Sequence, residues 1–406
     1  MLAPKTNLRP LRYHEELADY LRQEESETWT WFDSAQSQAD YAESLKLELL
    51  KQTYRLEAAA YPDLFAALND AKARLGLAIP VMVYQSQRSR ELNAALYFLP
   101  GEAHIVFEGD VLKLLDPGEL RGVLGHELAH YVLWSESARR FQVVDRIAQA
   151  MAGDPRAEVS HVESARLMRL YTEIYADRGA LLVTGDPTTV ISGLIKLQTG
   201  LTQVDAGSYV RQAEEVFARS KARTEELSHP EAFIRTRAVM LWAEGLPNLE
   251  AEVSRMIEGN PSLDKLDLLG QQRMTRLTRR WLQLFLRPVW FQTDAVRGHG
   301  RMFFPDIQFV GEKHQDDELL AALRDVDPSV RDYFCYLLLD FAAVDPELEA
   351  EPLRAAFALA LQLGWDERLE TLVVKELKLK KREAQSMRAA AREAQAGPAI
   401  APPADE

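Results

Sequence analysis

The sequence predicts a mostly helical fold (α+β) that contains one small antiparallel sheet. Over most of the 406 residues, apolar side chains recur every three to four positions, which is the period of an amphipathic helix. Between residues 79 and 108, by contrast, three short runs rich in β-branched and aromatic residues are separated by polar or Gly/Pro breaks. After residue 115, Asp–Pro pairs recur, and such pairs begin helices.

The N-terminal part is expected to hold two helices before the strands. Residues 1 to about 35 are polar and irregular, whereas 37–60 has Leu and Tyr at helical spacing. A second helix is expected over 62–75, with Gly76 close to its end. The predicted strands of the antiparallel sheet are 79–84, 93–100 and 104–108.

From residue 116 onward almost only helices are expected. Asp116 is a suitable N-cap, Pro117 suits the first helical position, and Glu119 completes a capping box. A second Asp–Pro pair, at 154–155, is expected to begin a helix that runs towards Val183. The further predicted helices are 188–199, 207–225, 230–244, 263–286, 316–324, 328–343, 347–363 and 366–395.

Composition excludes several classes of protein. The net charge is -14, from 62 acidic and 48 basic residues, which argues against a nucleic-acid-binding role because such proteins need a basic face. Cys335 is the single cysteine, so an internal disulfide framework is excluded and a reducing compartment is favoured. No run of about 18 apolar residues indicates a transmembrane segment, and no secretory signal is evident at the start. We therefore expect a cytoplasmic location.

One motif points to chemistry. His126, Glu127 and His130 form an H-E-x-x-H string within an expected buried helix. Residues four apart lie on one helix face, so the two imidazoles can bind one zinc ion, while Glu127 can move a proton to and from zinc-bound water. The alternative, that these are ordinary polar residues on a buried helix, is costly because buried polar groups need partners.

A third zinc ligand is expected on a later helix. The metzincin extension of the motif is absent after His130, so we expect a carboxylate, and Glu173 is the best candidate. Asp177 follows it at i+4 and is expected to accept a proton from a ligating histidine. The alternative for Asp177 is a surface ion pair with Arg178 or another neighbour. Weaker candidates for the third ligand are Glu158 and Glu163.

Four segments in this order resemble the HtpX-type zinc metallopeptidases, a group that includes the CAAX prenyl protease and the mitochondrial Oma-type peptidases (peptidase family M48). The first segment contains Asn93, Ala94, Gly101 and then His104, Ile105, Val106 and Phe107. The second is the H-E-x-x-H string, and the third pairs Glu173 with Asp177. The fourth is Ser228-His229-Pro230 with Arg235. The resemblance covers roughly residues 65–245.

The resemblance implies a gluzincin-like core and roles for further residues. Asn93, Ala94 and the strand 104–108 would bind substrate, because the family's edge strand pairs with the substrate backbone. His229 and Arg235 would lie near the zinc and stabilise the oxyanion or order the site. The alternative reading of these two is a helix N-cap region followed by a surface arginine. The sequence departs from the family in lacking transmembrane helices and in having Asp110 within the family's Gly-Leu-Leu segment.

Four regions follow from these observations. Residues 1–60 are an N-terminal helical segment, 61–245 a zinc metallopeptidase domain, and 262–395 a helical C-terminal domain. The tail, 396–406, is Pro/Ala-rich and expected to be disordered. The C-terminal domain weakly resembles TerB-like (tellurite-resistance) modules, although an unrelated helical bundle explains the pattern equally well. We expect it to bind a protein partner or to restrict access to the cleft.

The sequence as a whole predicts a zinc-dependent endopeptidase with one zinc ion per chain and a peptide or protein substrate. The predicted role is in protein quality control or regulation. Two alternatives stay open. A catalytically silent zinc-containing scaffold would keep the metal but need no Glu127, and an aminopeptidase would need an acidic anchor for a free N-terminus that the sequence does not show.

Overall fold

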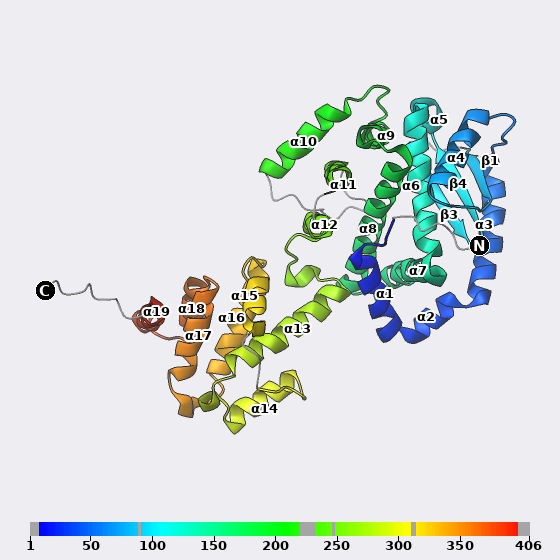
Figure 1. Cartoon of the computed structure of the whole chain (residues 1–406). Helices are drawn as coiled ribbons and strands as arrows, with labels where there is room; N and C mark the ends of the chain where they lie inside the picture. The colour runs from blue at the N-terminus through cyan, green and yellow to red at the C-terminus, as the bar shows by residue number, and fades with distance from the viewer. Residues whose placement is uncertain (1–7, 88–90, 220–231, 246–247, 310–313, 397–406) are drawn as a thin grey trace. The chain divides into compact units, whose positions relative to one another are not determined.

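The computed structural model describes residues 8–87, 91–219, 232–245, 248–309 and 314–396. Contacts between Cα atoms divide the chain into two units. Unit 1 comprises residues 1–259 with 267–269, and unit 2 comprises 260–266 with 270–406 (Figure 1). Among the described residues, no helix is long and apolar enough to cross a membrane.

Unit 1 combines one sheet with most of the helices of the chain. Its strands are β1 (Thr53–Arg55), β2 (Val81–Ser86), β3 (Asn93–Leu99) and β4 (Glu102–Glu108). Its helices before and among the strands are α1 (Arg12–Glu24), α2 (Ser26–Asp33), α3 (Ala35–Gln52) and α4 (Pro62–Arg74). Its later helices are α5 (Val111–Leu114), α6 (Pro117–Ser135), α7 (Arg140–Gly153), α8 (Val159–Thr184), α9 (Pro187–Thr199), α10 (Ala206–Arg219), α11 (Ala232–Glu244) and α12 (Leu249–Glu258).

The mostly helical class with one small sheet is confirmed, but the sheet is mixed rather than antiparallel. Its strand order is β1-β2-β4-β3, and β2 pairs with β4 in parallel. The short turn at Gly101, whose φ of 85° suits glycine, folds β3 and β4 into an antiparallel hairpin. Because β3 is the outer strand of this hairpin, β4 lies between β2 and β3 and runs parallel to β2.

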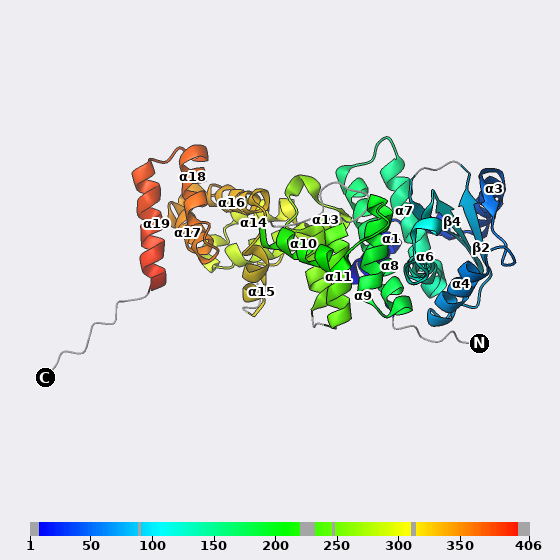
Figure 2. The same cartoon turned by 90° about the horizontal axis from the view of Figure 1, so that it is seen from above.

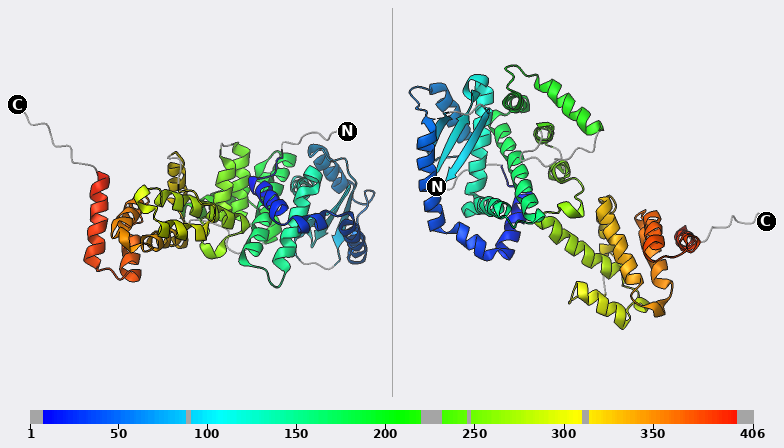
Figure 3. Two further views of the ribbon diagram at one scale, coloured as in Figure 1. Left: turned by 90° about the horizontal axis from the view of Figure 1, so that it is seen from below. Right: turned by 180° about the vertical axis from the view of Figure 1, so that it is seen from behind.

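The two faces of the sheet are covered by different helices (Figure 3). Leu45 and Leu49 of α3 pack with Tyr84 and Val106 on one face. On the other face, Ile105 and the residues two positions before and after it on β4 belong to the main core of unit 1. This core also includes the buried side of α6. The sheet thus lies between α3 and the helix that carries the H-E-x-x-H motif.

Several predicted boundaries were wrong for local reasons. Residues 12–33, expected to be irregular, form α1 and α2, and α1 buries a stripe of residues at positions 13, 14, 17, 18 and 21, whose period the intervening charges hid. The helix expected to reach residue 60 ends at Gln52, where β1 begins. The helix expected from Asp154 begins instead at Val159, because the Asp154 carboxylate accepts the backbone N–H of Arg156 and closes a separate turn.

Unit 2 is entirely helical in its described residues. Its helices are α13 (Leu268–Phe285), whose first two residues are grouped with unit 1, α14 (Asp294–Phe303), α15 (His314–Leu323), α16 (Pro328–Ala342), α17 (Glu351–Gln362), α18 (Asp366–Glu376) and α19 (Lys381–Ala396). Its core is built around fully buried aromatic rings, among them Trp281 and Phe334. Helices α17, α18 and α19 pack against one another (Figure 2).

The last predicted helix, 366–395, is two helices in the structure. Lys378 has a φ of 54°, a left-handed conformation that ends α18 before α19 begins. Arg388 of α19 then donates hydrogen bonds to Asp366, Glu367 and Glu370 at 2.6–2.8 Å. The Arg388 side chain therefore holds α19 against α18.

Candidate metal centre

Helix α6 begins at the predicted capping box. The Asp116 carboxylate accepts the backbone N–H groups of Gly118 and Glu119, and the Glu119 carboxylate accepts the backbone N–H of Asp116. Glu119 is also held by Lys196 and Ser192 of α9, at 2.8 and 2.6 Å. These contacts fix where α6 starts and hence which side chains it presents to α8.

Helices α6 and α8 approach closely because two glycines lie where they meet. A Cβ atom on Gly125 would lie 2.8 Å from the Cβ of Val183, and one on Gly179 would overlap the Cβ of Ala129. Real Cβ atoms essentially never come within 3.0 Å of a heavy atom. Glycine at both positions therefore sets the distance between the polar faces of the two helices.

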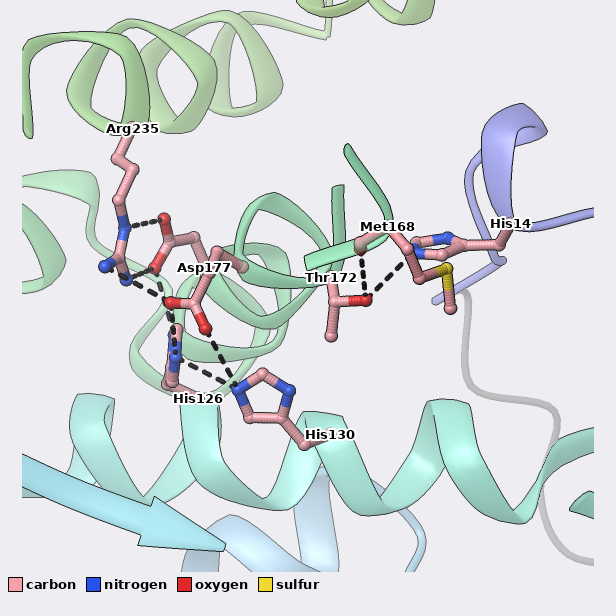
Figure 4. A network of polar contacts seen from close by, with 8 residues as sticks. His14, His126, His130, Met168, Thr172, Asp177 and Arg235 are labelled. Atoms are coloured by element: carbon pink, nitrogen blue, oxygen red, sulfur yellow. Dashed lines mark hydrogen bonds and ion pairs between the residues drawn. The ribbon is translucent and has the colours of Figure 1, made fainter. Parts of the chain in front are cut away.

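Three side chains from these helices converge on one point (Figure 4). The Nε2 atoms of His126 and His130 are 3.3 Å apart, and oxygens of Glu173 lie 3.5 and 3.8 Å from them. Ligand atoms of all three lie within 4.8 Å of one another. Ligands held at 2.0–2.2 Å by a tetrahedral zinc ion are separated by about 3.3–3.6 Å, so the donor types and their spacing fit zinc.

Asp177 and Arg235 contact this cluster through hydrogen bonds and ion pairs. The Asp177 carboxylate accepts a hydrogen bond from Nδ1 of His126 at 3.0 Å, and from Nε and Nη2 of Arg235 at 2.8 and 2.6 Å (Figure 4). Nη1 of Arg235 lies 3.3 Å from Glu173. With the proton on Nδ1, the Nε2 lone pair of His126 is free for a metal ion, which is how a carboxylate partner orients a ligating histidine.

The two imidazoles have opposite pKa shifts. Burial works to lower the pKa of His126, but the carboxylates of Asp177 and Glu173 outweigh it and raise the pKa to about 10. Burial lowers the pKa of His130 to about 4, and the neighbouring His126 adds to this. A metal ion needs both rings neutral, so its binding must release the proton of His126.

Glu127 lies in the same cleft as the ligand cluster and reaches the sheet. Its side chain is buried, and its carboxylate accepts the backbone N–H of Leu96 on β3. Burial raises the pKa of Glu127 to about 8, opposed by His126 and assisted by Glu173. A carboxyl group with a pKa near neutrality can both take up and release a proton at physiological pH.

A second buried hydrogen-bonded chain reaches the residue before Glu173 (Figure 4). Nδ1 of His14 accepts the backbone N–H of Leu11 at 3.1 Å, so Nε2 carries the proton and donates to the Thr172 hydroxyl at 3.2 Å. Thr172 in turn donates to the carbonyl of Met168 at 2.8 Å. The N-terminal helix α1 thus anchors α8 one residue away from the third ligand.

The cluster opens into a cleft of about 480 Å³. Its lining includes the three candidate ligands, Glu127, and the first residues of β3 from Asn93 to Leu96. In the described part of the sheet, β3 pairs only with β4, so its outer edge has no strand partner on the side of this cleft. Asn93 and Ala94 lie along the cleft wall.

The assignment of the substrate-pairing edge to residues 104–108 was wrong. Strand β4 is bonded to β2 on one side and to β3 on the other, so it has no free edge. The side chains of His104, Ile105, Val106 and Phe107 are buried. His104 instead shares a hydrogen bond with the Tyr84 hydroxyl at 3.1 Å, on the face covered by α3. In the described sheet, the free edge of the hairpin belongs to its other strand, β3.

The other predicted site residues have clear positions or lie outside the described residues. Arg235 is at the cluster, while His229 belongs to 220–231, a segment outside the described residues. Arg178 does not pair with Asp177, because its guanidinium stacks on Trp242, 3.6 Å from the ring centroid. Neither Glu158, which caps α8, nor Glu163, which pairs with Arg166, belongs to the cluster of candidate ligands.

Sequence reasoning missed two residues beside the cleft. The ring of Trp134 stacks on His130, with centroids 5.3 Å apart, and its position at i+4 from His130 could have revealed this. Asp145 on α7 also lines the cleft, and burial raises its pKa to about 6. No motif marks Asp145, since only the packing of α7 brings it to this wall.

Comparisons with known proteins agree with this geometry. The model of peptidase family M48 matches residues 63–243. A plastoglobule-localized metallopeptidase 48 of Arabidopsis thaliana is 29% identical over 202 residues, which is 45% of this chain and 58% of that protein. A protease HtpX homolog of Pseudarthrobacter chlorophenolicus is 29% identical over 175 residues, covering 38% of this chain and 60% of its own length. A protease HtpX homolog of Methanothermobacter thermautotrophicus is 24% identical over 184 residues, 40% and 69% of the two lengths.

The chain thus spans about three fifths of the length of the first two of these relatives. No solved structure matches the chain.

Proposed function

Residues 63–243 are a domain of peptidase family M48, and from this premise we propose that the chain is a zinc-dependent endopeptidase. The observation that carries the proposal is the convergence of His126, His130 and Glu173 within 4.8 Å, in one cleft with Glu127. These three residues would hold one zinc ion per chain. When bound there, zinc lowers the pKa of a coordinated water towards about 7 and polarises the carbonyl of the peptide bond.

Glu127 is the proposed general base and acid. Its carboxylate lies in the cleft beside the candidate ligands and is oriented by the backbone N–H of Leu96. It takes the proton of the attacking water and gives it to the leaving amine. A purely structural metal site would not need a buried carboxylate that is neither a ligand nor ion-paired, and this favours an enzyme over a silent scaffold.

Arg235 is proposed to order the site rather than to hold the oxyanion. Its guanidinium donates two hydrogen bonds to Asp177 and lies 3.3 Å from Glu173, so its donors are already committed to the carboxylates. Through Asp177 it fixes the orientation of His126. An oxyanion role for His229 stays a prediction.

Substrate alignment is assigned to the edge of β3. An extended peptide added beside residues 93–96 would run past the candidate ligands along the cleft wall. Pairing through the backbone does not require a free chain end, which favours cleavage inside a chain over removal of terminal residues. We also propose a cytoplasmic location, a role in quality control or regulation, and a protein partner for unit 2.

Zinc quantitation combined with digestion of a peptide library tests the proposal. The purified chain should hold about one zinc ion and cleave within peptides. Glu127→Gln should keep the zinc and lose cleavage, whereas Glu173→Ala should lose tightly bound zinc. Cleavage by Glu127→Gln at the parent rate would refute the assigned mechanism, and full zinc without cleavage in the parent would favour the scaffold. Stepwise loss of N-terminal residues would instead indicate an aminopeptidase.

A further inference from the structure

The cleft of the candidate ligands adjoins a second pocket of about 340 Å³, and the two share lining residues. Trp134, which stacks on His130, lines both cavities, and so does Leu96 of β3. A peptide lying along β3 across the candidate ligands must therefore pass the mouth of this pocket. One of its side chains, close to the bond being cleaved, would enter it.

Helix α7 supplies the polar wall of this pocket. Gln142, Asp145 and Gln149 recur at i, i+3 and i+7, so they share one helix face. The remaining wall is largely aromatic and comes from four different elements. These aromatic residues are Phe32 of α2, Tyr41 of α3, Tyr97 and Phe98 of β3 and Trp134 of α6. We call this cavity, defined by the three α7 residues and the five aromatic residues, the Asp145 pocket.

Asp145 is a carboxylate that forms no ion pair with any residue that the structure describes, although the positive charge of Arg169, which lines the adjoining cleft, acts on it and favours its ionised form. It accepts a hydrogen bond from Gln149 at 2.8 Å. Gln142, only 7% exposed, has a buried Oε1 atom without a hydrogen-bond partner in the same part of the structure. The pocket therefore contains a carboxylate whose acceptor capacity is only partly used, which is costly in a buried site unless a ligand brings donors.

The adjacent cation of the pocket is already engaged. Arg146 donates to the carbonyl of Phe32 at 3.3 Å, and its guanidinium lies over the rings of Phe32 and Tyr41, 5.1 and 5.6 Å from their centroids. An acidic substrate side chain would thus be repelled by the Asp145 carboxylate, and Arg146 would not be free to pair with it. A basic side chain would meet acceptors and aromatic faces.

We propose that the Asp145 pocket is a specificity subsite that binds a lysine or arginine side chain of the substrate. The Asp145 carboxylate accepts its N–H groups, and the aromatic wall packs against its aliphatic stem and faces its charge. This assignment rests on the proposed peptidase function and narrows its substrates to peptides with a basic residue near the cleaved bond.

Matched peptides test the subsite. Each substrate carries one lysine or one norleucine, which has a similar stem without the charge, at successive positions around the cleaved bond. At one position the zinc-loaded parent should cleave the lysine peptide about tenfold faster or more in kcat/KM, as a charge-assisted hydrogen bond allows. Asp145→Asn should remove this preference by slowing the lysine peptide alone.

The control is Asp154→Asn, at the exposed end of α7, where the aspartate pairs with Arg156 outside the pocket. It should leave the preference unchanged. Zinc content and thermal unfolding of both variants exclude a general loss of structure. A parent without preference for lysine at any position, or an equal loss on both peptides in Asp145→Asn, overturns the subsite while leaving the peptidase proposal intact.

A binding measurement separates failure of the subsite from failure of the function. Zinc-loaded Glu127→Gln is titrated with the same fluorescently labelled peptides and followed by anisotropy. Tighter binding of the lysine peptide by about tenfold, lost in Glu127→Gln with Asp145→Asn, supports the subsite even if the parent cleaves nothing. Equal affinity for lysine and norleucine peptides refutes the subsite even if the parent is an active peptidase.

Discussion

Gly179→Ala is expected to abolish tight zinc binding although it touches no ligand. Gly179 lies on α8 between the turn that carries Glu173 and the end of the helix, directly opposite Ala129 of the H-E-x-x-H helix. A new Cβ atom would overlap the Cβ of Ala129 and lie 3.1 Å from the carbonyl oxygen of Gly125. The two helices must therefore move apart at the point where they share the candidate ligands.

The size of the movement decides the outcome. Carbon atoms in contact are about 3.5–4.0 Å apart, so relieving an overlap below 3.0 Å requires a shift of at least roughly 0.5–1 Å. Zinc–ligand distances tolerate only about 0.2 Å. The shift therefore exceeds what the three ligands can absorb.

The effect on stability should be smaller than the effect on zinc. Alanine gains about 1 kcal/mol over glycine inside a helix, whereas overpacking costs typically about 1–3 kcal/mol. The metal-free variant should therefore be less stable than the metal-free parent by about 0–2 kcal/mol. Zinc affinity is measured by competition with a chelator, and stability by urea unfolding of the metal-free proteins.

Two further variants make the result interpretable. Gly298→Ala, inside α14, adds a Cβ that meets nothing within 4 Å and should leave zinc affinity unchanged. Ala129→Gly combined with Gly179→Ala removes the opposing Cβ and should restore much of the affinity. Parent-like zinc affinity in Gly179→Ala, or no recovery in the double variant, would refute the argument that helix spacing sets the ligand geometry.

Two further predictions concern the groups behind the ligands. Asp177→Asn should weaken zinc binding about 10- to 100-fold, because His126 loses its orienting carboxylate and Arg235 loses a buried counter-charge; unchanged affinity in chelator competition would contradict this. Burial lowers the pKa of His14 to about 3 in the folded protein, whereas in the unfolded chain it is near 6.5. Between these two pH values His14 is neutral when the protein is folded and protonated when it is unfolded. The unfolded state then binds more protons, so stability should fall as the pH drops from about 6.5 towards 3, by about 2 kcal/mol at pH 5. The metal-free His130, whose pKa burial also lowers, contributes a slope of the same sign to both proteins, so urea unfolding should show a shallower slope in His14→Gln than in the parent, and equal slopes would exclude His14 as a source.

The cluster of candidate metal ligands could be predicted because the spacing of its residues is local. Two histidines four apart share a helix face wherever that helix lies, and Glu173 with Asp177 repeats the same spacing on another helix. The cap at Asp116 was equally readable, since a capping box involves only residues within one turn. In each case the sequence neighbours are also the interacting partners.

The substrate edge could not be predicted in the same way. Residues 93–99 and 104–108 both have the pattern of a strand, and a hairpin pairs them identically whichever one is outermost. Only the parallel pairing of β2 with β4 decides that β3 is the edge. The Asp145 pocket could be predicted even less from the sequence, since its walls come from α2, α3, β3, α6 and α7.

The sequence alone therefore determined the helical class, the candidate zinc ligands and the proton-transfer role expected of Glu127, because each depends on interactions within one or two turns of helix. The tertiary structure decided which strand faces the cleft, that Arg235 holds the two carboxylates, and which side chains surround the substrate path. Those features depend on contacts between residues far apart in the chain, and such contacts leave no fixed spacing in the sequence.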